Sequence, residues 1–262
     1  MSDTVLFVAF PYVAVVLAVL IGIYRYARDR FSYSSFSSQF LENRTLFQGS
    51  VPWHYGIITI LLVHIVAAAL PGPWGQLLGA PWRLAVLEVT GLAVAVLVFF
   101  GLTLLIIRRL RIPRIRAVTT WLDWMLLAVL LVQVGLGCWV ALFYRWGGAW
   151  YIHTAAPWLV SLVTLHPQID TVTSLPWIVK LHLLGGFVIT ALFPFTRLVH
   201  LVTFPVTYLW RPYQVVIWNR RPLPRSASST RNMYGLAHQS PAPSRSTVPP
   251  MTDPAHRLEN IK

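Results

Sequence analysis

Five stretches of this sequence are each long and apolar enough to cross a lipid bilayer as a helix. They cover residues 4–24, 52–71, 85–107, 121–143 and 180–204. A bilayer core about 30 Å thick requires about 20 apolar residues of helix, because each residue adds about 1.5 Å. Of the 262 residues, 56% are hydrophobic and only 11% are charged, whereas about 25% of the residues in a soluble domain are charged. We therefore predict an all-α integral membrane protein with five transmembrane helices.

The positive charges between these stretches are distributed unevenly, and this pattern predicts the orientation of the chain. Arginines follow the first stretch, fill the loop at 108–116 and recur after the fifth stretch, whereas the intervening loops carry chiefly Arg83, Arg145 and Lys180. Short cytoplasmic loops are enriched in Lys and Arg, so we expect the N-terminus outside and the C-terminus in the cytoplasm. The first stretch lacks a basic leading region and a small-residue cleavage site, so we interpret it as an uncleaved anchor.

The net charge of +13 would also suit a nucleic-acid-binding protein. The basic residues, however, occupy the positions expected of cytoplasmic loops, which favours membrane lipid or an acidic partner over nucleic acid. We assign residues 1–220 to the membrane domain and expect residues 221–262, rich in Pro, Ser and Arg, to be a disordered cytoplasmic tail. Cys138 is the only cysteine, which excludes a disulfide within the chain and a thiolate-bound iron–sulfur cluster.

Four histidines lie inside or at the edges of two apolar stretches. His54 and His64 belong to the second stretch, and His182 and His200 belong to the fifth. An ionisable side chain within a membrane is costly and suggests a functional role, and imidazole is a common axial ligand of haem iron. We therefore predict two bis-histidine haems held between the second and fifth helices. Since both axial positions of each iron would be filled, such haems pass electrons and do not perform oxygen chemistry.

The predicted topology selects how the four histidines pair. The second and fifth helices run in opposite directions, so His54 and His200 lie near the inner surface, while His64 and His182 lie nearer the outer surface. A haem about 10 Å across cannot join residues at opposite surfaces. Eighteen residues at about 100° each would also place His182 and His200 on one face of a continuous fifth helix. Small residues at 185 and 186 would let a bulky ring approach that helix closely.

Other interpretations of the histidines stay open at this point. A transporter or proton channel would use them as titrating groups, although the sequence shows neither the internal repeats nor the broken helices of many transporters. A structural anchor would use them only for packing. His153 and His166 lie in an outer loop with Trp146, Trp150 and Trp158, and we interpret them as interfacial residues.

The motifs around the histidines resemble one known family, the gamma subunit of membrane-bound respiratory nitrate reductase. The resemblance covers roughly residues 1–220 and rests on SSQFLENR at 37–44, RIRAVTT at 114–120, LHLLGG at 181–186 and FPFTRLVH at 193–200. The histidine spacings of ten and eighteen residues also agree with the family. The resemblance implies a five-helix dihaem cytochrome b, a multi-pass protein of the cell inner membrane, that oxidises menaquinol or ubiquinol near the outer face and releases protons there.

The resemblance also implies the electron path and the partners. Residues matching His64 and His182 would hold the distal haem, and those matching His54 and His200 would hold the proximal one. Electrons would then pass to a cytoplasmic iron–sulfur beta subunit, and a molybdopterin alpha subunit would reduce nitrate. A gamma-like cytochrome of a sulfur-compound oxidoreductase, or of a nitrite-oxidising complex with reversed electron flow, remains an alternative, because its haem ligands would look the same.

The family's quinol site includes a lysine between the second and third helices, and this chain has Arg83 at the matching position. An arginine keeps the positive charge and can donate to a quinone oxygen, but it cannot be deprotonated. We expect Glu88 to be a nearby proton acceptor or, alternatively, a residue with an interfacial role at the start of the helix. Asp123 suits the start of the fourth helix, with a proton relay as the alternative role. The candidates for contacts with haem propionates or lipid phosphate are Arg108, Arg109, Arg116 and Arg197.

Overall fold

The computed structural model describes residues 2–28 and 44–202, which belong to the first of two compact units, residues 1–209. The predicted tail at 221–262 lies outside the described residues. The five spans are Ser2–Arg28, Thr45–Ala69, Pro81–Arg111, Trp121–Phe143 and Trp177–Phe195. The described residues form helices and contain no strand. The prediction of an all-helical protein with five membrane-spanning helices is confirmed.

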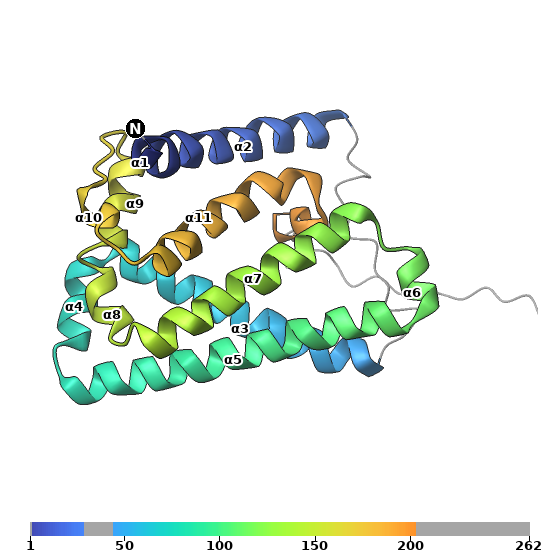
Figure 1. Cartoon of the computed structure of the whole chain (residues 1–262), viewed down its shortest axis with the longest axis horizontal. Helices are drawn as coiled ribbons and strands as arrows, with labels where there is room; N and C mark the ends of the chain where they lie inside the picture. Colours follow the sequence, from blue (N-terminus) through green and yellow to red (C-terminus); the bar gives the residue numbers. More distant parts are fainter. Residues whose placement is uncertain (1, 29–43, 203–262) are drawn as a thin grey trace, which may run out of the picture. The chain divides into compact units, whose positions relative to one another are not determined.

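The first span consists of α1 (Ser2–Thr4), a π-helical segment η1 (Val5–Ala9) and α2 (Phe10–Arg28). The other spans are built on α3 (Arg44–Ala69), α5 (Pro81–Arg111), α7 (Trp121–Phe143) and α11 (Trp177–Leu192). Successive long helices run in opposite directions (Figure 1). Four short helices gather at the end near the N-terminus, namely α4 (Pro71–Leu78), α8 (Gly147–Tyr151), α9 (Ala155–Val163) and α10 (Asp170–Thr173). The short α6 (Pro113–Ala117) lies at the opposite end, so the two ends of the bundle are built differently.

Prolines and one capping box define where the helices begin. Pro71, Pro81 and Pro113 each occupy the first turn of a helix, where a missing amide hydrogen costs nothing. Helix α7 begins with a capping box, in which the Asp123 amide donates to the Thr120 hydroxyl and the Thr120 amide donates to the Asp123 carboxylate. The predicted helix-start role of Asp123 is thus seen in the structure.

The fifth helix is shorter than the predicted stretch of 180–204. Helix α11 ends at Leu192 and is followed by two 3-10 segments, η3 (Phe193–Phe195) and η4 (Arg197–Leu201). Pro194 lacks an amide hydrogen and its ring opposes continuation of the helix, and Thr196 between the segments is extended with φ −114° and ψ −179°. His200 therefore lies on η4. The expectation that His182 and His200 share one face of a continuous helix is wrong.

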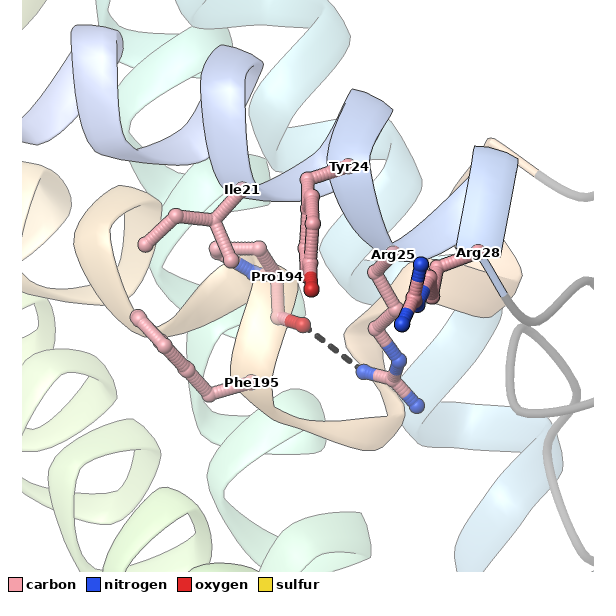
Figure 2. Close-up of a pocket in the computed structure, with 6 residues that line it drawn as sticks. All are labelled: Ile21, Tyr24, Arg25, Arg28, Pro194 and Phe195. Carbon is pink, nitrogen blue, oxygen red and sulfur yellow. Dashed lines mark hydrogen bonds between the residues drawn. The ribbon is translucent and has the colours of Figure 1, made fainter.

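The end of α2 holds this break in place. The Arg25 guanidinium donates a 2.7 Å hydrogen bond to the carbonyl of Pro194, drawn as a dashed line in Figure 2. A pocket of about 380 Å³ surrounds the contact and is lined by residues of α2 and η3, namely Ile21, Tyr24, Arg25, Arg28, Pro194 and Phe195. None of these lining residues was a predicted site residue. The pocket lies where η3 packs against the end of α2.

Helices α3 and α5 pack closely against each other, where three glycines, Gly49, Gly56 and Gly101, allow the backbones to approach. A Cβ atom added at Gly101 would lie 2.8 Å from the carbonyl oxygen of Gly49 and 2.9 Å from the amide nitrogen of Trp53. A Cβ added at Gly56 would lie 2.3 Å from a Val98 methyl carbon. Small residues commonly allow this close packing between membrane helices. The contact sets the position of α3, which carries His54 and His64.

We expect Gly101→Ala to destabilise the bundle, because the added methyl meets backbone atoms of α3 that cannot move aside alone. Overpacking of this kind costs about 1–3 kcal/mol, which thermal unfolding of the full chain should register as a lower Tm. Gly91→Ala is the matched control on the same helix, since no atom lies within 4 Å of its added Cβ. Equal Tm values for the two variants would contradict this description of the interface.

Candidate functional site

The structure brings His54 and His200 together at the end of the bundle where α6 lies. His54 comes from α3 and His200 from η4. Their ring centres are 6.1 Å apart, and their ring planes are inclined by 69°. A metal–imidazole bond is about 2.0–2.1 Å long and the ring centre lies about 1.1 Å beyond the nitrogen, so imidazoles on opposite sides of one metal have centres about 6.2–6.4 Å apart. The observed spacing therefore fits two axial ligands of one iron.

His64 and His182 lie nearer the other end of the bundle. His64 lies ten residues after His54 on α3, and His182 lies in the first turns of α11. The two rings are close enough for their charges to interact. The pairs that the structure brings together are those that opposite helix directions predict. A group of three or more His, Cys, Asp or Glu side chains suited to a bare metal ion is not found among the described residues, and each pair offers two imidazoles.

All four histidines share one hydrogen-bonding pattern, in which Nδ1 faces a backbone carbonyl oxygen. The acceptors are Ser50 for His54 at 2.8 Å, Ile60 for His64 at 2.8 Å, Gln133 for His182 at 3.2 Å and Arg197 for His200 at 2.6 Å. A carbonyl oxygen only accepts, so in each neutral ring Nδ1 carries the hydrogen and Nε2 presents its lone pair. Metal-bound histidines are held in this way. His166 shows the same contact with Thr164, so the pairing of the rings across the bundle is the more distinctive feature.

A second layer of contacts holds His182 against α7. The side-chain amide of Gln133 donates a 2.9 Å hydrogen bond to the backbone carbonyl of His182, and the backbone carbonyl of Gln133 accepts from the His182 ring. Gly137 lies one turn further along α7, and a Cβ there would be 3.0 Å from Cε1 of His182. A Cβ at Gly185 would lie only 2.0 Å from the side-chain oxygen of Gln133. Gly185, which we expected to admit a bulky ring, accommodates Gln133, while an added Cβ at Gly186 meets no atom within 4 Å.

Arg83 and Glu88 both lie near the beginning of α5, at the end of the bundle that carries the short helices. Arg83 donates a 3.3 Å hydrogen bond to the carbonyl of Gln76 and lies 5.9 Å from the ring centre of Trp82. Its Nε atom is buried and has no hydrogen-bond partner within the described part of the chain. The Glu88 carboxylate accepts a 2.8 Å hydrogen bond from the amide of Gly148 on α8. Glu88 thus has a structural contact, whichever chemistry it performs.

The four arginines proposed for propionate contacts lie at the His200 end of the bundle. Arg197 forms a 2.8 Å ion pair with Asp123, whose side chain is 6% exposed. Arg109 donates to the Thr119 hydroxyl at 3.0 Å, Arg108 is buried, and Arg116 is exposed on α6. A guanidinium has five donor hydrogens, so arginines with protein contacts can still accept a further anion.

Two residues beside the histidines were missed by sequence reasoning. Gln133 was detectable in principle, because an amide inside an apolar span needs a polar partner. Tyr151 lies with its ring centre 5.7 Å from that of His64, and burial raises the pKa of its hydroxyl above the usual value. Tyr151 carried no signal in the sequence that set it apart from the other aromatic residues of its loop.

The five apolar helices define an integral membrane protein. Its candidate sites are pairs of histidines contributed by elements that run in opposite directions. The model of the nitrate reductase gamma subunit family matches residues 3–219. The chain belongs to this family, as the motifs of its sequence predicted.

Three relatives illustrate the breadth of the match. The nitrate reductase gamma chain of Bacillus subtilis is 33% identical over 227 residues, which is 84% of this chain and 100% of the relative. The respiratory nitrate reductase 1 gamma chain of Escherichia coli is 32% identical over 212 residues, covering 79% and 93%. The nitrate reductase-like protein NarX of Mycobacterium tuberculosis is 32% identical over 208 residues, covering 78% of this chain but 32% of the relative.

We expect Gly185→Ala to destabilise the contact between α7 and α11, because its methyl group would displace the Gln133 amide. Gly186→Ala is the neighbouring control and should leave the Tm of the full chain unchanged or raised, since Ala favours helix over Gly. Gln133→Ala alone should cost about 1 kcal/mol for the lost hydrogen bond. Combined with Gly185→Ala it should cost less than the sum of the two, because the obstructing amide is gone. Strict additivity would contradict the proposed contact.

Proposed function

We propose that this chain is the quinol-oxidising membrane subunit of a nitrate reductase complex and that it holds two b-type haems. His54 and His200 would hold the proximal haem, and His64 and His182 would hold the distal haem. Electrons leave the membrane toward an iron–sulfur beta subunit, and nitrate is reduced on a molybdopterin alpha subunit. Membership of the gamma subunit family supports this proposal.

The observation that carries the proposal is the 6.1 Å spacing of the His54 and His200 rings. This spacing is compatible with two imidazoles on one iron, and because edge-to-face ring packing also places ring centres about 4.5–7 Å apart, the proposal rests on the spacing together with the family match. The Nδ1 contacts of all four rings with backbone carbonyls support the same assignment, since they direct Nε2 lone pairs toward a metal. Haem bound at these positions would supply reversible one-electron transfer.

We further propose that the end of the bundle carrying His200 faces the cytoplasm. The basic residues of this end come from four separate elements, namely Arg25 and Arg28 of α2, Arg108, Arg109 and Arg111 of α5, Arg114 and Arg116 of α6, and Arg197 of η4. The positive-inside rule places such clusters on the cytoplasmic side. The proximal pair then lies nearest the iron–sulfur partner, and the distal pair lies near the outer face, where Arg83 is the candidate quinol contact.

The optical spectrum of the purified protein tests the assignment. We expect about two b-type haems per chain in the reduced-minus-oxidised spectrum, because each pair completes the axial ligands of one iron. His64→Ala or His182→Ala should remove the distal haem and quinol oxidation while part of the proximal absorption survives. His54→Ala or His200→Ala should remove the proximal haem while part of the distal absorption survives.

The control for these variants is His166→Ala, since His166 has the same Nδ1 contact but lies outside the two pairs. It should retain both haems. A folded wild-type protein without haem would reject the proposed function, and loss of the same haem from His54→Ala and His64→Ala would reject the pairing.

Arg83→Ala should slow quinol oxidation, because the guanidinium is the proposed hydrogen-bond donor to a quinone oxygen. Steady-state kinetics with a soluble quinol analogue should show a higher KM, as expected for a lost binding contact. Arg83→Lys should restore part of the activity, since it keeps the positive charge. Unaltered kinetics in Arg83→Ala would remove Arg83 from the quinol site.

A further inference from the structure

The short helix α8 is anchored to α5 through the Glu88 side chain. The carboxylate oxygen of Glu88 accepts a 2.8 Å hydrogen bond from the amide of Gly148. A Cβ atom at Gly148 would lie 2.9 Å from a Leu87 methyl carbon and 3.1 Å from a Leu78 methyl carbon. The backbone of α8 therefore lies close to Leu87 of α5 and Leu78 of α4, whose side chains would have to shift to admit a Cβ atom at Gly148. The residue before α8, Trp146, has a left-handed φ of 66°, which costs energy that the contacts of α8 must offset.

Three residues beyond Gly148, helix α8 presents Tyr151 to His64. The two ring centres are 5.7 Å apart, with the ring planes inclined by 78° in an edge-to-face contact. The Tyr151 hydroxyl donates to the carbonyl of His64 at 3.3 Å. This hydrogen bond is long for a hydroxyl donor, so the ring contact is the stronger part of the interaction.

Tyr151 is itself held on its other sides by apolar residues. It packs against the buried cluster of Ala67, Trp74 and Leu78, which joins α3 to α4. Ala67 lies three residues after His64 on α3, so the cluster and the histidine share a neighbourhood. The tyrosine is thus fixed by the cluster on one side and by α8 on the other, and it limits rotation of the His64 ring.

We infer that Glu88 and Tyr151 are positioning residues for His64, with Glu88 acting through the amide of Gly148 and the placement of α8. The inference rests on the proposed function, in which His64 is an axial ligand of the distal haem. Residues that orient a metal-binding histidine tune the properties of the metal, and their loss typically lowers metal affinity or activity about 10–100-fold. In this role, the side chain at position 88 needs only to accept the hydrogen bond from the Gly148 amide. A role as proton acceptor from quinol requires a group that ionises.

Substitution of Glu88 by glutamine separates the two roles. The glutamine carbonyl still accepts the Gly148 amide hydrogen but cannot take up a proton near neutral pH. In the complex with its partner subunits, we expect Glu88→Gln to retain quinol oxidation within about 3-fold of wild type, whereas Glu88→Ala should lose about 10-fold or more. The distal haem should show a shifted midpoint potential and a shifted low-spin EPR signal in Glu88→Ala, with the proximal signals unchanged.

Tyrosine variants provide the second arm of the experiment. Tyr151→Leu removes the aromatic edge and should shift the distal potential and EPR signal as Glu88→Ala does, while Tyr151→Phe keeps the ring and should stay close to wild type. Asp170→Ala is the control for removal of a carboxylate at the same end of the bundle, because Asp170 is exposed on α10. Retained proximal haem in each variant shows that the chain has folded.

Two outcomes would overturn the inference. Loss of quinol oxidation in Glu88→Gln with an unshifted distal haem would assign Glu88 to proton uptake. Unshifted distal signals in both Glu88→Ala and Tyr151→Leu would show that neither residue positions His64. Failure of the proposed function is a separate result, since it would appear as a wild-type protein that lacks the distal haem.

Discussion

Every backbone amide inside a bilayer core must find its hydrogen bond within the protein, and the architecture of this chain follows from that requirement. Only helices satisfy it for a single chain of this composition, so the five spans are helical and their polar chemistry is carried by side chains. Each functional side chain then has a fixed depth along its helix. The two histidines of α3 acquire different partners because they lie ten residues apart on one rigid element.

Much of this arrangement was predictable, because hydropathy, loop charge and histidine position each depend on local sequence. The five spans required only the length of apolar runs, and pairing His54 with His200 required only opposite helix directions. The end of α11 at Leu192 was missed because the residues after it are as apolar as those before it. Pro194 was the visible signal, since proline opposes helix continuation. The contacts of Gln133 and Tyr151 were out of reach, because they join segments whose packing no local pattern encodes.

The two ends of the bundle are stabilised by different interactions. At the His200 end, the Arg197–Asp123 ion pair and the Arg25 contact with Pro194 tie η3 and η4 to α7 and α2. At the other end, short helices pack through apolar clusters, such as the one built on Phe7, Trp158, Leu162 and Val172. The arginines at the His200 end match the proposed cytoplasmic face.

The break at Thr196 makes the two histidine-bearing elements unequal in their tolerance of changes in chain length. One residue inserted between His54 and His64 would turn these rings by about 100° relative to each other, because the helix transmits every added residue as rotation. Between Leu192 and Arg197 the chain has already left the helix, and side-chain contacts with Arg25 and Asp123 decide where η4 lies. The ten-residue spacing of His54 and His64 on α3 is therefore a strict geometric constraint. The eighteen-residue spacing of His182 and His200 can tolerate a change in length, because the segment between them is not one continuous helix.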